Sequence, residues 1–198
     1  MVRATASAAR QSILCRVPRV SVAELGARLL ALDIALAGAF NQSIRRSRNG
    51  QRIARQAAGG LASAEVAIML VLAARGDVRT ALRMVSAVAT VYGASELIGL
   101  AWRRERPFVH LDRVEELLAH APHRSFPSRH VASGLAMATI ARPRHPKTGQ
   151  IMAGLAWLLG LSRVAAGLHY PSDVLAGAVL GLSVGYAWRM KRRYARHT

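Results

Sequence analysis

Long apolar runs, separated by arginine-rich connections, constrain this chain of 198 residues more than any other feature. Several runs are close to the roughly 17–25 residues that a helix needs to cross a bilayer. Small residues are common within them, which favours close packing of helices in lipid. The sequence therefore predicts an all-α fold, a polytopic membrane helical bundle of about six transmembrane helices. We expect them at residues 22–40, 57–74, 80–102, 127–142, 151–164 and 171–190.

The charge of the chain is strongly basic, with a formal net charge of +18. In a soluble chain this would suggest nucleic-acid binding. Here the basic residues lie between apolar runs, and aromatic residues, which would stack on bases, make up only 5%. We therefore expect the lipid bilayer, and no nucleic acid, as a partner. Residues 1–21 and 191–198 are predicted to be basic tails around one membrane domain at 22–190. Cys15 is the only cysteine, which excludes an internal disulfide.

An even number of spans places both termini on one side of the membrane and the polar connections after the third and fifth runs on the other. Lys and Arg are modestly more frequent on the side of the termini, although the predicted first loop is also basic (Arg45, Arg46, Arg48, Arg52 and Arg55). By the positive-inside rule, we predict a multi-pass protein of the cell inner membrane with cytoplasmic termini. The polar connections then face the extracytoplasmic side.

The connection at residues 162–173, with the sequence SRVAAGLHYPSD, carries the densest group of reactive side chains. Pro171 suits the first position of a helix, so His169 would lie just ahead of a helix N-terminus, which attracts anions such as phosphate. Asp173 lies in the first turn and can orient one ring nitrogen of His169, leaving the other free to attack. Arg163 offers a planar fork of donors for phosphoryl oxygens. The alternative is a polar hairpin between two membrane helices.

Two further stretches carry the same residue types: RRERPF at 103–108 and SFPSRH at 125–130. With the first stretch, they resemble the type-2 phosphatidic acid phosphatase family of membrane lipid phosphatases. The pattern of that family is Lys, six residues, Arg-Pro; then Pro-Ser-Gly-His; then Ser-Arg, five residues, His, three residues, Asp. The resemblance covers about residues 60–190. The matching positions are Arg106, Pro107, Pro127, Ser128, His130, Ser162, Arg163, His169 and Asp173.

Two positions depart from the pattern of the family. Arg129 stands in place of Gly, and Gly99 stands where the Lys should be. The missing Lys removes one expected phosphate contact. Arg103, one helical turn before Arg106 in a continuous helix, is the first candidate to replace it, and Arg104 is the second.

The resemblance implies a hydrolysis that needs no metal or other cofactor. His169, oriented by Asp173, would attack phosphorus and form a phosphohistidine, while His130 would protonate the departing oxygen and then help to activate water. The phosphate would be held by Arg103, Arg106, Ser128, Arg129, Ser162 and Arg163. These ligands are Arg and Ser side chains, and the sequence offers no carboxylate cluster suited to Mg²⁺.

The stretches RERPFV and SFPSRH look like the undecaprenyl diphosphatase branch of the family, which implies a phosphorylated membrane lipid, undecaprenyl diphosphate, as the substrate. One alternative is a phosphomonoesterase for phosphatidate, phosphatidylglycerophosphate or a prenyl-phosphate sugar. Another is a catalytically inactive membrane scaffold, which the missing Lys keeps open. The family also resembles the soluble vanadate haloperoxidases, against which the apolar runs argue.

Apolar residues at helical spacing in 111–118 predict either a short amphipathic helix on the membrane surface or a plain connector. Two acids inside apolar runs, Glu65 and Glu96, are expected to form ion pairs or to be protonated and hydrogen-bonded. Four of the remaining histidines are expected to be solvated: His120, His123, His145 and His197. The exception is His110, which lies close to Arg106 in the sequence.

Overall fold

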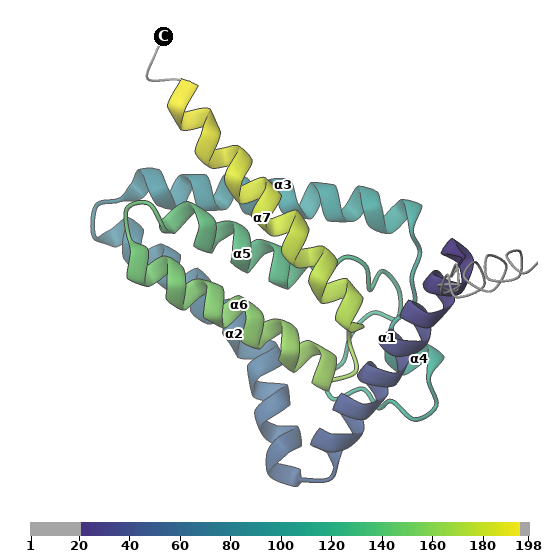
Figure 1. The fold of residues 1–198 in the computed structure, drawn as a ribbon. Coiled ribbons are helices and arrows are strands. Elements are labelled where there is room, and N and C mark those ends of the chain that lie inside the picture. Colours follow the sequence, from purple (N-terminus) through teal and green to yellow (C-terminus); the bar gives the residue numbers. More distant parts are fainter. Residues whose placement is uncertain (1–20, 195–198) are drawn as a thin grey trace, which may run out of the picture. The chain divides into compact units, whose positions relative to one another are not determined.

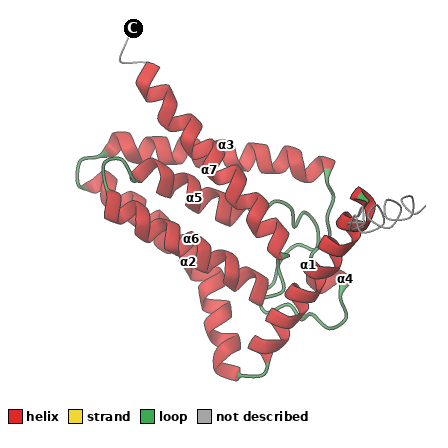
Figure 2. Ribbon diagram, viewed as in Figure 1, coloured by secondary structure: helices red, strands yellow, loops and turns green. Residues whose placement is uncertain are grey.

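The computed structural model describes residues 21–194, which form helices joined by loops and turns and contain no strand (Figure 2). The expected all-α fold is confirmed over this part of the chain. Cys15 and all of the predicted basic tail at residues 1–21 except Ser21 lie outside the described residues. The helices are α1 (Val22–Arg45), α2 (Arg48–Ala74), α3 (Val78–Ala101), α4 (Pro107–His110), α5 (Arg129–Ala141), α6 (Pro146–Ala165) and α7 (Pro171–Tyr194).

The chain divides into two compact units, Met1–Ala31 and Leu32–Thr198, and the division falls inside α1. In the first unit, α1 begins with a reciprocal capping box. The Glu24 amide donates to the Ser21 hydroxyl over 3.1 Å, and the Ser21 amide donates to the Glu24 carboxylate over 2.8 Å. All three motif stretches belong to the second unit.

The second unit is built around α5, which packs against α3, α6 and α7 (Figure 1). Every residue from Val131 to Ala141 is buried. Three glycines of α7, spaced four residues apart, bring that helix against the backbone of α5. A Cβ added at Gly177 would lie 2.5 Å from the Ser128 carbonyl oxygen, and one at Gly185 would lie 2.7 Å from the Thr139 Cβ. Small residues therefore allow the close packing that the composition predicts.

The outer surface of the bundle is apolar. Leu70, Leu97 and Val179, on α2, α3 and α7, are each 59% or more exposed, as lipid-facing side chains would be. By length and hydropathy alone, two described helices are suited to crossing a membrane, α2 and α3. The other four predicted spans coincide with α1, α5, α6 and α7, which do not meet the same criteria of length and hydropathy.

Two connections differ from the expectation. The predicted first loop is only two residues long in the structure, because α1 continues to Arg45 and α2 begins at Arg48. Ser47 caps α2 by accepting a hydrogen bond from the Gly50 amide over 3.3 Å, which lets a helix start inside the basic stretch.

The stretch at residues 111–118 is an irregular connector, so the amphipathic helix is wrong and the plain connector is confirmed. Val114 and Leu117 point into the protein and are 5% and 6% exposed. Leu117 packs against Ala165 and Leu168, the segment that leads to His169. These apolar residues therefore pack toward the protein interior beside the segment that leads to His169, and they do not face lipid.

Candidate active site

The three motif stretches meet at one end of the bundle, where α6 ends and α5 and α7 begin. Backbone hydrogen bonds join them: the Ser128 amide donates to the Asp173 carbonyl over 2.9 Å, and the Ser125 amide donates to the Arg104 carbonyl over 3.0 Å. The Arg106 guanidinium donates to the Leu168 carbonyl over 2.6 Å. Residues more than 60 positions apart in the chain are thus held as one unit.

His169 lies at the centre of this unit and is 3% exposed. Its Nδ1 is 2.8 Å from the carbonyl oxygen of Ser125 and 3.6 Å from Oδ2 of Asp173. Because a carbonyl oxygen only accepts, Nδ1 must carry the proton and Nε2 the lone pair. The nearer partner of the ring is therefore a backbone carbonyl, and Asp173 acts from slightly farther away than the spacing predicts.

The environment of His169 favours the neutral ring. Burial lowers the pKa of His169 to about 4; Asp173 opposes this shift, and Arg163 and Arg106 add to it. A neutral imidazole with a free Nε2 is the form that a nucleophile needs. His130 lies in the first turn of α5, with Arg163 and Arg129 as its positively charged neighbours.

Two buried arginines face this centre. Arg106 donates from Nε to the Ala121 carbonyl over 2.7 Å, and its NH1 lies 3.4 Å from Nε2 of His169. Arg163 donates from NH1 to the Ala58 carbonyl over 3.1 Å. Its Nε, together with the buried hydroxyl of Ser128, has no hydrogen-bond partner within residues 21–194. These two unsatisfied groups are suited to the oxygens of an anionic ligand such as phosphate.

Two predicted phosphate contacts are directed elsewhere. The hydroxyl of Ser162 donates to the Leu159 carbonyl over 2.7 Å inside α6, which uses its single O–H. Arg129 turns toward α3, where it pairs with Glu96 at 3.6 Å and lies over the Tyr92 ring at 5.5 Å. The expected ion pair of Glu96 is present, since Arg124 also contacts its carboxylate. Glu65 is buried, and its Oε1 has no hydrogen-bond partner among the described residues.

The structure corrects the expectation for the missing Lys. Residues 102–106 are not helical, so Arg103 does not lie one helical turn before Arg106, and it is exposed. Arg104 binds Asp33 and Asp173 instead of pointing at a phosphate site. The basic side chain that packs over Gly99 is Arg124, whose Cβ would lie 3.8 Å from a Cβ added at this glycine.

Sequence reasoning missed three partners of the site. His120, expected to be solvated, accepts a hydrogen bond from NH2 of Arg163 over 2.7 Å. Asp33 lies inside the first predicted apolar run, yet it is 8% exposed and bonded to the start of α7. An acid inside an apolar run was the available signal for Asp33. The Ser125 carbonyl and His120 carry no such signal.

Comparison with known proteins agrees with this arrangement. The PAP2 superfamily matches residues 80–196, and the chain belongs to that family. Its resemblance to the type-2 phosphatidic acid phosphatases is thereby confirmed.

Two curated relatives cover part of the chain. The chain is 37% identical over 95 residues to the "Bacitracin transport permease protein BcrC" of Bacillus licheniformis, covering 48% of this chain and 46% of that protein. It is 38% identical over 90 residues to the "Undecaprenyl-diphosphatase BcrC" of Bacillus subtilis (strain 168), covering 46% of each. The chain thus spans about half the length of the curated relatives it matches.

A solved structure shares the fold. The transmembrane PAP2-type phosphatidylglycerolphosphate phosphatase of Bacillus subtilis aligns with a TM-score of 0.67 at 21% identity, covering 84% of this chain and 87% of that one. The likeness shows that the two chains share a helical-bundle fold, which confirms the expected fold class.

Proposed function

We propose that this protein is an integral-membrane, metal-independent hydrolase that converts undecaprenyl diphosphate to undecaprenyl phosphate. Its family and its similarity to a curated undecaprenyl-diphosphatase support the broader class, a hydrolase of lipid phosphate or diphosphate. The observation that carries the proposal is the neutral His169, whose unprotonated Nε2 accepts a hydrogen bond from NH1 of the buried Arg106 over 3.4 Å. A nucleophile beside fixed positive charge, at the end of an apolar bundle, suits a phosphorylated lipid.

In the first step, Nε2 of His169 attacks the terminal phosphorus in line with the bridging oxygen. The P–O bond to that oxygen breaks, and a phosphohistidine forms. The positive charge that develops on the ring is stabilised by the Ser125 carbonyl at Nδ1 and by the Asp173 carboxylate nearby. Arg106 and Arg163 would bind the equatorial oxygens, where fixed donors contribute most to phosphoryl transfer.

His130 is the proposed general acid for the departing oxygen and, in the second step, the base that takes a proton from water. That water attacks the phosphohistidine, releases inorganic phosphate and restores His169. Arg163 and Arg129 are the cationic neighbours of His130, so a negatively charged substrate bound beside them would offset their repulsion and favour the protonated form of His130.

The placement in the cell belongs to the same proposal. We infer a multi-pass inner-membrane protein with a phosphatase domain at residues 22–190 and cytoplasmic termini. The site would then face the extracytoplasmic side. The apolar exposed surface of the helices supports the placement in a membrane, and the basic termini support this orientation.

Phosphate release from the purified protein in detergent tests the proposal. A prenyl diphosphate and phosphatidate are compared in the presence of EDTA, with His169→Ala as the inactive reference. We expect metal-free turnover that is faster on the diphosphate and absent in the variant. Faster turnover of phosphatidate would instead make the protein a phosphomonoesterase. Complete loss with EDTA, restored by a divalent metal, would overturn the metal-free mechanism.

A further inference from the structure

We propose that Asp33 of α1 and Arg104, in the segment after α3, form a positioning pair that holds Asp173 in place beside His169. NH2 of Arg104 is 2.7 Å from Oδ2 of Asp33, and NH1 is 2.7 Å from Oδ1 of Asp173. Neither residue is part of the motif pattern of the family. The inference rests on the proposed function, because it concerns the geometry of the same catalytic histidine.

The pair fixes the first turn of α7 as well as the carboxylate. The Ser172 amide donates to Oδ1 of Asp33 over 2.9 Å, and the Ser172 hydroxyl contacts the other carboxylate oxygen. NH1 of Arg104 also donates to that hydroxyl over 2.7 Å. One guanidinium and one carboxylate thus hold two successive residues at the N-terminal end of the helix.

Both carboxylate oxygens of Asp173 are engaged in this network. Oδ1 accepts from Arg104, and Oδ2 accepts from the Tyr170 amide over 2.8 Å while lying 3.6 Å from Nδ1 of His169. The guanidinium is further held over the Tyr170 ring, 3.9 Å from its centroid. Asp173 is fully buried, so rotation of its carboxylate would cost several of these bonds at once.

The consequence is mechanistic. The ion pair with Arg104 holds the Asp173 carboxylate near Nδ1 of His169, where its negative charge stabilises the imidazolium that forms during the attack. Loss of Arg104 would leave two buried carboxylates facing each other without a cation. The first turn of α7 would then shift. A misplacement of about 1 Å in a catalytic group costs roughly 10²-fold in rate.

Steady-state kinetics on a prenyl diphosphate test the pair through Arg104→Gln, Asp33→Asn and the double variant, with Arg79→Gln and Asp112→Asn as exposed controls. We expect kcat to fall roughly 10–100-fold in Arg104→Gln while KM changes little, because the phosphate contacts remain. Arg104→Lys should recover part of kcat. The double variant should lose little more than Arg104→Gln alone, since the residues act as one unit.

A kcat within twofold of wild type in Arg104→Gln, or additive losses in the double variant, would overturn the inference. Amide exchange provides a readout that does not depend on turnover. The Ser172 amide should exchange faster in the isosteric Asp33→Asn variant, and its exchange rate should be unchanged in Asp112→Asn. Absence of phosphatase activity in wild type would refute the proposed function. The exchange result would still show whether Asp33 holds the first turn of α7.

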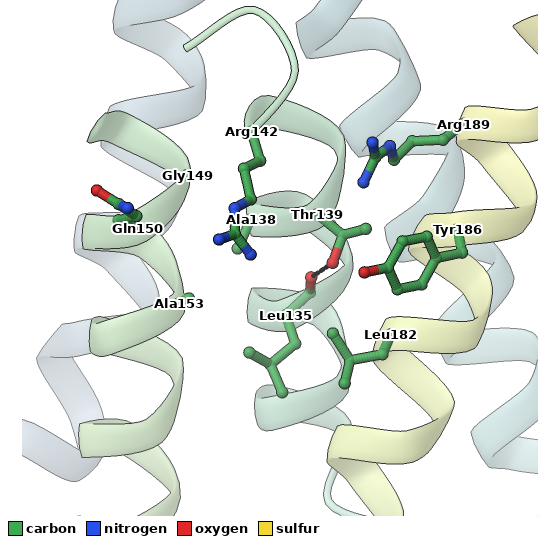
Figure 3. Close-up of a pocket in the computed structure, with 10 residues that line it drawn as sticks. All are labelled: Leu135, Ala138, Thr139, Arg142, Gly149, Gln150, Ala153, Leu182, Tyr186 and Arg189. Carbon is green, nitrogen blue, oxygen red and sulfur yellow. Dashed lines mark hydrogen bonds between the residues drawn. The ribbon is translucent and has the colours of Figure 1, made fainter. Parts of the chain in front are cut away.

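A second inference comes from a different part of the bundle. A groove of about 190 Å³ lies between α5, α6 and α7 near the α5–α6 turn, at the opposite end of these helices from His169 (Figure 3). Arg142, Thr139, Tyr186 and Arg189 line its polar part, and Leu135, Ala153 and Leu182 line its apolar part. Arg189 lies over the Tyr186 ring at 5.2 Å. No carboxylate is among the described lining residues.

We infer that this groove binds an anionic phospholipid of the surrounding bilayer. Two guanidinium groups match the phosphodiester of the headgroup, and the leucines offer a surface for an acyl chain. Basic pockets between membrane helices bind anionic headgroups in this way. The charge complementarity favours an anionic lipid over a zwitterionic one, and the inference does not depend on the proposed function.

Thermal unfolding in detergent, with added phosphatidylglycerol or phosphatidylcholine, tests this groove. Phosphatidylglycerol should raise Tm of wild type and of the exposed control Arg75→Gln/Arg79→Gln. The shift should vanish in Arg142→Gln/Arg189→Gln, with phosphatidylglycerol affinity by native mass spectrometry falling at least tenfold. An equal shift with phosphatidylcholine, or an unchanged shift in the double variant, would overturn the inference.

Discussion

Replacing His120 by Ala tests whether the connector at residues 111–125 contributes to the chemistry. His120 accepts a hydrogen bond from NH2 of Arg163 over 2.7 Å, and Arg163 is 2% exposed. A hydrogen bond to a charged group is worth about 1.5–3 kcal/mol. Because 1.4 kcal/mol is a factor of ten, His120→Ala should lower kcat/KM roughly 10–100-fold if this bond aligns Arg163 for the transition state.

The pH dependence follows from the same contact. Burial, with Arg163 and Arg106, lowers the pKa of His120 below its usual value of about 6.5. The neutral ring accepts from Arg163 above the lowered pKa, and protonation below it removes the acceptor and adds a second positive charge. His120→Gln keeps an acceptor that does not titrate. This variant should retain kcat/KM within about threefold and should decline less at acid pH.

The matched control is His123→Ala, because His123 is an exposed histidine of the same connector. The measurement is the initial rate on a prenyl diphosphate between about pH 5 and 8, a range that brackets the usual pKa of histidine. Wild-type kcat/KM in His120→Ala at every pH, or an equal loss in His123→Ala, would refute the role of His120.

Three further predictions concern the proposed site. His169→Ala should reduce turnover of every substrate to background, whereas His130→Ala should cost more on phosphatidate than on a prenyl diphosphate, because an alkoxide needs the proton more than a phosphate oxygen; phosphate-release assays compare the two. Burial lowers the pKa of His169 from about 6.5 to about 4, so the folded state binds fewer protons than the unfolded state in that window. The contribution of neutral His169 to the free energy of unfolding should therefore be complete above pH ~6.5, and the free energy of unfolding should fall by about 3 kcal/mol as the pH is lowered to ~4. Chemical denaturation at several pH values measures this fall, which a His169→Gln variant should reduce. An impermeant thiol probe should label a Cys placed at Glu115 from outside intact cells, but not one placed at Lys147; the reverse pattern would turn the site to the cytoplasm.

Much of the site was predictable from local sequence. Pro171 and Pro127 mark helix starts, and His169, Asp173 and His130 stand at fixed offsets from them. These relations span a few residues, and a helix start has nearly the same geometry in any fold. The apolar runs likewise predicted a helical membrane bundle, because their length and composition limit what the backbone can do in lipid.

Helix boundaries and contacts of single arginines were not predictable in this way. Arg103 was expected to share a helical face with Arg106, but α3 ends at Ala101. The apolar residues of the 111–118 connector have helical spacing, yet Val114 and Leu117 are buried, and Leu117 packs against Ala165 at the end of α6. Periodicity indicates which side chains avoid water without indicating what covers them.

The tertiary structure alone decided which groups complete the site. Ser172 meets Asp33 across 139 positions of the chain, His169 meets the Ser125 carbonyl across 44, and Arg163 meets His120 across 43. No local pattern relates such residues, because their distance depends on how whole helices pack. The sequence by itself determined the reactive side chains and the helix ends that carry them. Their partners were determined by the way Asp33 of α1 and the segment between α3 and α5 pack against the ends of α6 and α7, since a buried polar group takes whichever donor or acceptor the assembled bundle brings within reach.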